Sequence, residues 1–287
     1  MSNLSARTPV PRPGSQDVLE KARDENFPVA LRCLPRDARR DLEALYTYAR
    51  YVDDLGDAFT GDRTAALHAV SQDVHRLYDG TAPELPAVAG LAGLVRDHHV
   101  PPDPFLALVE ANLVDQEVTR YETFEDLLGY CTLSANPVGN VVLHVFGYAD
   151  ADRIALSDRV CTGLQLLEHW QDVAEDHRAG RVYLPQEDLR RFGVTEAMLA
   201  ADSASPELRA LLRFETDRAL AWLSSGAFLV STLHGWARLA VSGYVAGGRA
   251  AAAALRAADH DSLSSVPKPS TAGVLGAWLG GLVRRPG

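Results

Sequence analysis

The sequence predicts an all-α protein, and three features lead to this expectation. Apolar residues make up 47% of the 287 residues. Alanine and leucine are abundant among them, whereas stretches in which valine or isoleucine alternates with polar residues are scarce. In several long segments the apolar residues recur at intervals of three and four, which is the period of one helix face. We therefore expect one large helical domain or two closely packed halves.

The first half of the chain contains four predicted helical regions. Within residues 36–59, Leu42, Leu45 and Val52 lie on one face of a helix. A second helix is predicted over residues 62–78, because glycine and proline in residues 80–86 interrupt the pattern after it. Further helices are expected near residues 86–98 and 102–120.

The second half contains four longer helical regions. Residues 124–148 are predicted to form a helix that is interrupted at residues 135–137, where Pro137 removes a backbone hydrogen bond. Residues 151–177 form the next predicted helix, which Gly180 ends, and Pro185 prevents an early restart. The last long helices are expected at residues 206–233 and 236–258.

The two ends differ in composition from the region between them. Residues 1–15 are expected to be a flexible leader, because residues 1–14 are polar and contain three prolines. We expect a catalytic domain over residues 16–269 and a tail over residues 270–287. Residues 272–283 are apolar apart from glycine and precede Arg284 and Arg285, but this stretch is too short to span a bilayer. It could lie on a membrane or dock on the protein as a terminal helix.

Charge and cysteine content exclude several classes of protein. The formal net charge of −10 argues against nucleic-acid binding, which needs a broad basic surface. Cys33, Cys131 and Cys161 are odd in number and lack Cys-x-x-Cys spacing, so neither a disulfide framework nor a zinc site is indicated. We expect a cytoplasmic protein, with peripheral attachment to the inner face of the membrane as an option for the tail.

Two acidic motifs of the same form are the strongest functional signal. Asp53 and Asp57 form one Asp-x-x-x-Asp pattern, and Asp172 and Asp176 form another 119 positions later. Side chains four residues apart lie on the same face of a helix, about 5–6 Å apart, so each pair can offer two carboxylates to one hard cation. Mg²⁺ usually takes one or two carboxylates and completes its shell with water and phosphate oxygens. A diphosphate held by Mg²⁺ between two such helices is the predicted ligand, and solvated helix faces are the ordinary alternative.

Polar residues extend each acidic face. Tyr46 and Arg50 precede Asp53 at helical spacing, and an arginine fork suits phosphate oxygens. Gln165 and Glu168 precede Asp172 in the same way. Arg181 follows the second motif and could close over a bound phosphate. For both arginines the alternative is an ordinary surface position.

Several motifs together resemble the squalene/phytoene synthase family over residues 24–269. They are Tyr46 and Arg50 before Asp-Asp-Leu-Gly-Asp, Tyr130-Cys, the Ser-Ala-Asn-Pro-Val-Gly run that ends at Gly139, the segment from Gln165 to Asp176, and Gly-Arg-Val-Tyr-Leu-Pro around Tyr183. Within the family, residues 25–29, the Ser-Ala-Asn run and Trp-Gln-Asp at residues 170–172 resemble the bacterial hydroxysqualene synthase branch of hopanoid pathways. The resemblance implies an isoprenoid synthase fold with a central cavity, two aspartate-rich motifs on opposing walls, and Mg²⁺ between them.

The motifs and the resemblance give each residue an expected role. The expected Mg²⁺ ligands are Asp53, Asp57, Asp172, Asp176 and Glu168, and the expected catalytic residues are the four aspartates and Arg50. The expected substrate-binding residues are Tyr46, Arg50, Tyr130, Val138, Gly139, Gln165, Arg181, Tyr183 and Tyr244. Phe27, Tyr130, Trp170 and Tyr244 could stabilise a carbocation with their ring faces, or they could simply be core residues.

Glu168 departs from the family pattern, which usually has asparagine at this position. Its extra negative charge could bind Mg²⁺ directly, or it could raise the pKa of a neighbouring carboxyl group. Leu133 also replaces a residue that is often basic in relatives.

The expected reaction is the Mg²⁺-dependent conversion of presqualene diphosphate to hydroxysqualene, with release of diphosphate. No Gly-x-Gly-x-x-Gly nicotinamide motif follows a strand-like segment, which agrees with a reaction that needs no hydride. The resemblance implies a presqualene diphosphate synthase and a squalene-forming reductase as pathway partners. One alternative is head-to-head condensation of two farnesyl diphosphates to presqualene diphosphate or squalene. Another is a non-catalytic helical assembly factor of the same fold, and a di-iron bundle is disfavoured because no histidine follows glutamate at the required spacing.

Overall fold

The computed structural model describes residues 34–270, 273, 274 and 278. This part of the chain is all-α, as predicted, and its single pair of bridged extended residues is Arg120 and Val182. The helices are α3 (Arg36–Asp57), α4 (Arg63–Tyr78), α5 (Pro86–Ala89), α6 (Ala92–His98), α7 (Asp103–Val114), α8 (Phe124–Ser134), α9 (Asn136–Phe146), α10 (Ala151–Gln171), α11 (Val173–Arg178), α12 (Gln186–Phe192), α13 (Glu196–Leu199), α14 (Pro206–Gly226), α15 (Leu229–Thr232) and α16 (Gly235–Ala257).

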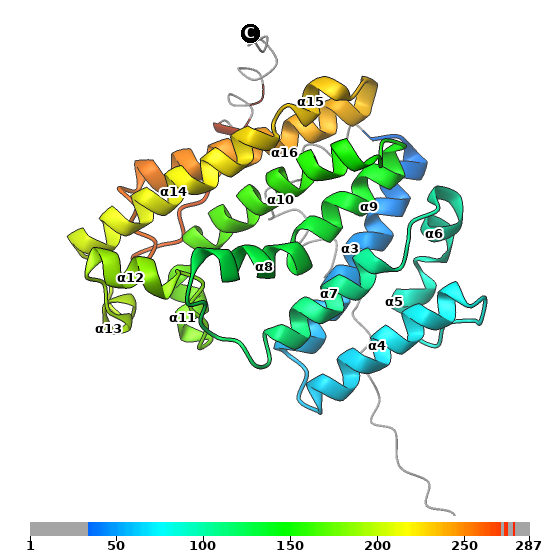
Figure 1. Cartoon of the computed structure of the whole chain (residues 1–287), viewed down its shortest axis with the longest axis horizontal. Coiled ribbons are helices and arrows are strands. Elements are labelled where there is room, and N and C mark those ends of the chain that lie inside the picture. The colour runs from blue at the N-terminus through cyan, green and yellow to red at the C-terminus, as the bar shows by residue number, and fades with distance from the viewer. Residues whose placement is uncertain (1–33, 271–272, 275–277, 279–287) are drawn as a thin grey trace, which may run out of the picture.

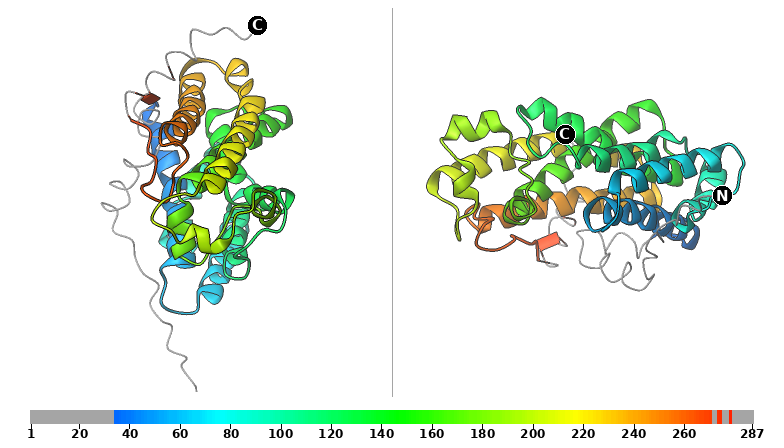
Figure 2. Two further views of the ribbon diagram at one scale, coloured as in Figure 1. Left: turned by 90° about the vertical axis from the view of Figure 1, so that its left-hand side faces the viewer. Right: turned by 90° about the horizontal axis from the view of Figure 1, so that it is seen from below.

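Helix α10 lies at the centre of the fold. It packs against α14, α9, α16 and α8, and Figure 1 shows α14, α10 and α9 running side by side. Helix α7 packs against α3, α4, α8 and α9. In Figure 2, α3 and α16 lie toward one face of the molecule, and α8 and α9 lie toward the opposite face. Two groups of buried apolar side chains result, one around α3, α4 and α7 and the other around α10 and α14.

Local signals explain where the site-bearing helices begin. The Thr123 and Asp126 side chains form a capping box at the start of α8. Asp150 accepts a hydrogen bond from the Arg153 backbone nitrogen at the start of α10. Gly163 allows α10 to approach α14, because a Cβ atom at this position would lie 2.6 Å from the Leu223 backbone nitrogen. These contacts fix the direction and depth of α10, which carries the second acidic motif.

Several predicted helices are shorter or more broken than expected. The interruption at residues 135–137 is confirmed, since α8 ends at Ser134 and α9 begins at Asn136. The predicted helix over residues 102–120 ends at Val114, the one over residues 206–233 is divided into α14 and α15, and the one over residues 86–98 into α5 and α6. The helix over residues 151–177 breaks at Asp172. Helices α12 and α13 were not predicted, and α12 begins directly after Pro185.

The expected leader and most of the tail lie outside the described residues. Phe27 and the motif at residues 25–29 also lie outside them, so these expectations stay predictions. Of the tail, Trp278 is described, and its indole nitrogen donates a hydrogen bond to the Ser242 hydroxyl on α16 at 2.7 Å. Among the described helices, none is both long enough and apolar enough to cross a membrane.

Candidate active site

The first acidic motif occupies the C-terminal turns of α3. Asn112 on α7 donates a hydrogen bond from its side-chain nitrogen to an Asp53 carboxylate oxygen at 3.0 Å. Arg50 forms its ion pair with Asp54 at 2.7 Å, so its closest carboxylate is neither of the two aspartates of the motif. Gln116, one turn after Asn112, donates to the Gly56 carbonyl at 3.2 Å. Helix α7 therefore holds this end of α3 through polar side chains.

Asp53 is both accessible and surrounded by protein. Its side chain is exposed to solvent, yet burial raises its pKa to about 6; the Asn112 hydrogen bond opposes this rise, and the Asp57 charge adds to it. A carboxylate with these two properties faces solvent while protein atoms crowd around it. Such a carboxylate is costly to ionise and available to a cation.

The second acidic motif lies where α10 passes into α11. Asp172 has φ −102° and ψ 15°, which breaks the helix, but the Asp176 backbone nitrogen still donates to the Asp172 carbonyl at 2.9 Å. The two carboxylates consequently remain about one helical turn apart, although the expected continuous helix is absent. The break follows tertiary contacts at the end of α10, where the Gln171 amide donates to the Pro267 carbonyl and the Ser262 hydroxyl donates to the Trp170 carbonyl.

Repulsion among carboxylates adds to burial in the second motif. Burial, followed by the charge of Asp172, raises the pKa of Asp176 to about 7, with smaller contributions from Glu175 and Glu168. The pKa of Asp172 is also raised, first by burial and then by Glu175, while Lys268 opposes the rise. Without a bound cation, the second acidic motif therefore holds more negative charge than its surroundings can stabilise.

Arg181 connects the two walls. Its guanidinium donates a hydrogen bond to Asp57 at 2.8 Å, and its positive charge lowers the pKa values of Asp115 and Asp176. The Nε atom of Arg181 is buried and has no hydrogen-bond partner among the residues that the structure describes. The side chain lies between the two acidic motifs, and part of its donor fork is unused.

Arg120 fixes the backbone next to Arg181. It donates hydrogen bonds to the Gly180 and Thr119 carbonyls, both at 2.7 Å, and forms a two-bond ion pair with Glu196 at 2.7 and 2.8 Å. The Val182 backbone nitrogen donates to the Thr119 carbonyl at 3.0 Å. The Gly180 turn has φ +86°, a conformation that favours glycine.

Asp115, at the end of α7, holds two of the predicted tyrosines. Its carboxylate accepts hydrogen bonds from the hydroxyls of Tyr130 at 2.7 Å and Tyr183 at 3.3 Å. Burial chiefly raises the pKa of both phenols above the ordinary value, so they stay protonated and donate. Burial also raises the pKa of Asp115, and the hydrogen bond from Tyr130 opposes this effect.

His169 lies beneath Tyr183 in the same group of side chains. The two rings stack with their centroids 3.8 Å apart and an interplanar angle of 18°. The Nε2 atom of His169 is 3.2 Å from the side-chain nitrogen of Gln165. Burial, aided by the positive charge of Arg181, lowers the pKa of His169 to about 3, so the ring is neutral at ordinary pH.

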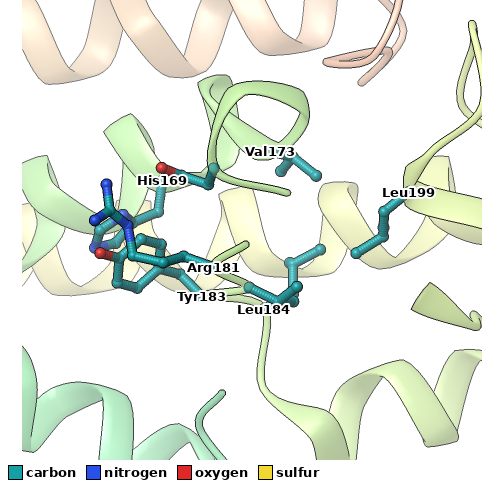
Figure 3. Close-up of a pocket in the computed structure, with 8 residues that line it drawn as sticks. His169, Val173, Arg181, Tyr183, Leu184 and Leu199 are labelled. Atoms are coloured by element: carbon teal, nitrogen blue, oxygen red, sulfur yellow. The ribbon is translucent and has the colours of Figure 1, made fainter. Parts of the chain in front are cut away.

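A small pocket opens between these side chains and the second motif. His169, Arg181 and Tyr183 form one side, and Val173, Leu184 and Leu199 form the other, as Figure 3 shows; Asp176 also lines it. Charged groups therefore stand beside an apolar surface.

The remaining predicted residues occupy less polar positions. Val138 and Tyr244 are partly buried against the apolar core around α3. Glu168 is exposed, in line with Asp172. Trp170 is fully buried and donates its indole hydrogen to the Glu215 carbonyl at 3.2 Å, so the core alternative is correct for this residue. Tyr46 is partly exposed on α3.

Gly139 is explained by helix packing. A Cβ atom at this position would lie 2.5 Å from both the Cys161 sulfur and the Ser157 hydroxyl, so glycine lets α9 lie close to α10. Its expected position beside the substrate stays a prediction.

Sequence reasoning missed five polar residues that the structure brings to this site. Asn112, Asp115 and Gln116 follow one another at intervals of three and one in an otherwise apolar segment, and this spacing could have indicated a polar helix face. His169 gave no signal because it resembles any core residue of α10. Lys268 reaches Asp172 from a distant part of the chain, and the packing that places it there is not visible in its local sequence.

The donor set fits a hard divalent cation. Within the described ranges, no three His, Cys, Asp or Glu side chains are close enough to hold a metal ion by themselves. Asp53 and Asp176 nevertheless supply accessible oxygen ligands, and their pKa values, raised first by burial, show that their ionised forms are costly and would be stabilised by a bound cation. Mg²⁺ can accept such a site because it usually retains waters or phosphate oxygens in its shell.

This arrangement defines an all-helical protein with two facing carboxylate motifs and an arginine between them. The squalene/phytoene synthase family model matches residues 21–272. The chain belongs to the squalene/phytoene synthase family, and it is therefore a synthase that uses a prenyl diphosphate. This result argues against the non-catalytic assembly factor.

Relatives with different names are similar to the chain to comparable degrees. A phytoene synthase of Mycobacterium bovis is 32% identical over 72% of this chain and 70% of its own length. A presqualene diphosphate synthase and a hydroxysqualene synthase, both of Rhodopseudomonas palustris, are 34% and 32% identical; they cover 68% and 74% of this chain and 71% and 72% of their own lengths. These identities define the family and leave the particular reaction open.

A solved structure has the same fold. The squalene synthase HpnC from Alicyclobacillus acidocaldarius matches with a TM-score of 0.78 and 38% identity, over 86% of this chain and 94% of that one. The isoprenoid synthase fold expected from the sequence is confirmed.

Proposed function

We propose that the protein converts presqualene diphosphate to hydroxysqualene in a Mg²⁺-dependent reaction that releases diphosphate. The observation that carries the proposal is Arg181, whose guanidinium pairs with Asp57 of the first motif and lies beside Asp176 of the second. A cationic donor fork between two carboxylate walls suits a diphosphate bridged to metal ions. The similarity to the hydroxysqualene synthase of Rhodopseudomonas palustris, which is 32% identical over 74% of this chain, supports this reaction.

The side chains at one end of the site would bind Mg²⁺ and the diphosphate, and those at the other end would bind the hydrocarbon. Asp53, Asp57, Asp172 and Asp176 would hold Mg²⁺, with Glu168 as a further ligand on the same face. Mg²⁺ would neutralise the charge that develops on the leaving diphosphate. Tyr46, Arg50 and Arg181 would donate hydrogen bonds to the diphosphate oxygens.

The opposite end of the site would receive the hydrocarbon. Val138 and Tyr244, both partly buried, would contact the isoprenoid chain and exclude stray water. Tyr130, held by Asp115, would present its ring near the developing cation, where a desolvated cation–π contact is worth about 2 kcal/mol. Tyr183, whose ring is stacked on His169 and Tyr121, would contact the substrate with its ring edge. Gln165 would provide a polar group between the two ends.

Condensation of two farnesyl diphosphates to presqualene diphosphate remains a second candidate. Its support is the presqualene diphosphate synthase relative, which is 34% identical over 68% of the chain. The same metal-binding residues would serve either reaction, because each begins with loss of diphosphate.

Product analysis separates the two candidates. The purified full-length chain is incubated with Mg²⁺ and either presqualene diphosphate or farnesyl diphosphate, and the extracted products are identified by mass spectrometry. We expect hydroxysqualene from presqualene diphosphate and no consumption of farnesyl diphosphate. Consumption of farnesyl diphosphate would favour condensation, and no consumption of either substrate would contradict both candidates.

A further inference from the structure

His169 is a buried polar residue for which the proposed function has not yet supplied a role. Its side chain is 6% exposed, and its ring is stacked between the polar site and the core on the face of Tyr183. The Nε2 atom of His169 lies 3.2 Å from the Gln165 side-chain nitrogen. A buried imidazole oriented by both a ring stack and a hydrogen bond is fixed in position.

The contact with His169 determines which way the Gln165 amide faces. An amide nitrogen can only donate, so the His169 Nε2 atom accepts and the Gln165 carbonyl oxygen remains for another partner. In the described part of the chain, no hydrogen bond to the Gln165 side-chain oxygen is found. Gln165 is partly exposed, so water can reach it.

Gln165 also lies at a suitable distance from the second acidic motif along α10. It is seven residues before Asp172, which corresponds to about two turns or roughly 10 Å along the helix axis. A diphosphate bound at Asp172 would place the adjacent carbon of the substrate within this interval. The free amide oxygen would therefore lie near the carbon that loses the diphosphate.

We propose that His169 is a positioning residue that orients Gln165 so that its carbonyl oxygen holds the water molecule that captures the carbocation. This inference rests on the proposed conversion of presqualene diphosphate. In the reaction, the bond from carbon to the diphosphate oxygen breaks and the diphosphate keeps the electron pair. One carbon–carbon bond of the cyclopropane then migrates to the cationic carbon and a second one breaks, so the ring opens and the positive charge moves to the carbon that the water attacks. A lone pair of the water oxygen forms the new carbon–oxygen bond, and one proton of the resulting oxonium passes to the released diphosphate.

The orientation of Gln165 would decide between two fates of the cation. A cation in an apolar cavity loses a proton to give an alkene unless one water stands within reach, and a water in such a place needs polar partners to remain there. If the amide turned around, its nitrogen would face the water and present a donor where the attacking oxygen needs its lone pair free. With the His169 proton on Nδ1, the lone pair on Nε2 accepts from the amide nitrogen and repels the amide oxygen, so the contact disfavours the turned orientation for this tautomer.

The test measures the ratio of the alcohol product to the alkene product, and not the rate of turnover. His169→Phe keeps an aromatic ring on Tyr183 and removes the acceptor, whereas His169→Gln can restore an acceptor. Tyr121→Phe is the matched control, because the Tyr121 hydroxyl in the same aromatic group has no hydrogen-bond partner within the described ranges. Each full-length variant turns over presqualene diphosphate with Mg²⁺, and the ratio of alcohol to alkene is measured by mass spectrometry among the products formed.

We expect the ratio of alcohol to alkene to fall by about fivefold or more in His169→Phe, the change that loss of one hydrogen bond produces. It should recover in part in His169→Gln and stay at the wild-type value in Tyr121→Phe. An unchanged ratio in His169→Phe, or an equal fall in Tyr121→Phe, would overturn the role of His169. If the wild-type protein does not consume presqualene diphosphate, the proposed function itself fails, which is a different result from a ratio that does not move.

Discussion

The raised pKa values of Asp53 and Asp176 predict that Mg²⁺ binding depends strongly on pH. A carboxyl group must lose its proton before it binds the metal, so protons compete with Mg²⁺. Burial and neighbouring negative charge raise the pKa of Asp176 to about 7, and burial raises that of Asp53 to about 6. Both groups therefore titrate in a range where most other carboxyl groups of the protein stay ionised.

The size of the effect follows from these two values. Between pH 8 and pH 6, the protonated share of Asp176 rises from about one tenth to about nine tenths, which weakens metal binding about tenfold. The protonated share of Asp53 rises from near zero to about one half, which contributes a further factor of about two. Together they predict that the apparent affinity for Mg²⁺ is about twentyfold weaker at pH 6 than at pH 8.

The same values fix the sign of the effect on stability. The folded-state pKa of Asp176 lies above its ordinary value, so its ionisation destabilises the folded protein. This cost is absent below about pH 4 and complete above about pH 7, so the contribution of Asp176 to stability falls as the pH rises through that window. Mg²⁺ should offset the cost, and its stabilising effect should be larger at pH 8 than at pH 6.

A thermal-unfolding titration with Mg²⁺ at pH 6, 7 and 8 measures both quantities. The Mg²⁺ concentration that gives half of the maximal shift in Tm should rise about twentyfold from pH 8 to pH 6, and only about twofold in Asp176→Asn. Asp217→Asn is the control, since Asp217 is exposed and paired with Arg256 far from the motifs. The reasoning is refuted if the half-effect concentration does not change with pH, or if Asp176→Asn keeps the full dependence.

Four further predictions address individual residues and the tail. Each of Asp53→Asn, Asp57→Asn, Asp172→Asn and Asp176→Asn should lower kcat by roughly 10² or more without lowering Tm, because each removes a ligand and no core contact; near-wild-type turnover in all four would contradict the metal site. Arg50→Lys should raise KM and lower kcat, because a point charge cannot replace a two-pronged donor; unchanged kinetics would leave Arg50 as the partner of Asp54 alone. Glu168→Gln should weaken the Mg²⁺ dependence of turnover more than Glu168→Asn, and superimposable titrations would exclude Glu168 as a ligand. The full chain should float with anionic lipid vesicles and a chain ending at Pro269 should not, because the apolar tail and its two arginines are the expected contact; equal flotation would place the contact elsewhere.

The first wall of the site could be predicted from sequence because it is built within one helix. Leu42, Leu45 and Val52 set the buried face of α3, and this leaves Asp53 and Asp57 on the accessible side. Spacing alone is sufficient for such a prediction. The partner of Arg50 was harder to predict, because Asp53 and Asp54 lie three and four residues after Arg50 and both spacings bring side chains together on a helix.

The second wall depends on parts of the chain that are far apart in sequence. The helix breaks at Asp172 although the residues around it favour helix, because Gln171 and Trp170 are bound to the segment around Ser262 and Pro267. The same contacts bring Lys268 near Asp172. Local propensity could not reveal the break, since tertiary contacts override small differences in helix preference.

Arg181 serves both the negative charge of the acidic motifs and the proposed activity, because the same guanidinium can bind a carboxylate or a diphosphate. Asp57, Asp115 and Asp176 all lie within the range of its charge, and their repulsion would be larger without it. In the structure described here, Arg181 is the counter-charge for Asp57; with Mg²⁺ on the carboxylates, the guanidinium nitrogen that now binds Asp57 would be released to the diphosphate. An exchange of partners of this kind would keep the site close to electrically balanced before and after substrate binds. It would therefore allow several carboxylates to share a partly buried site without a large loss of stability.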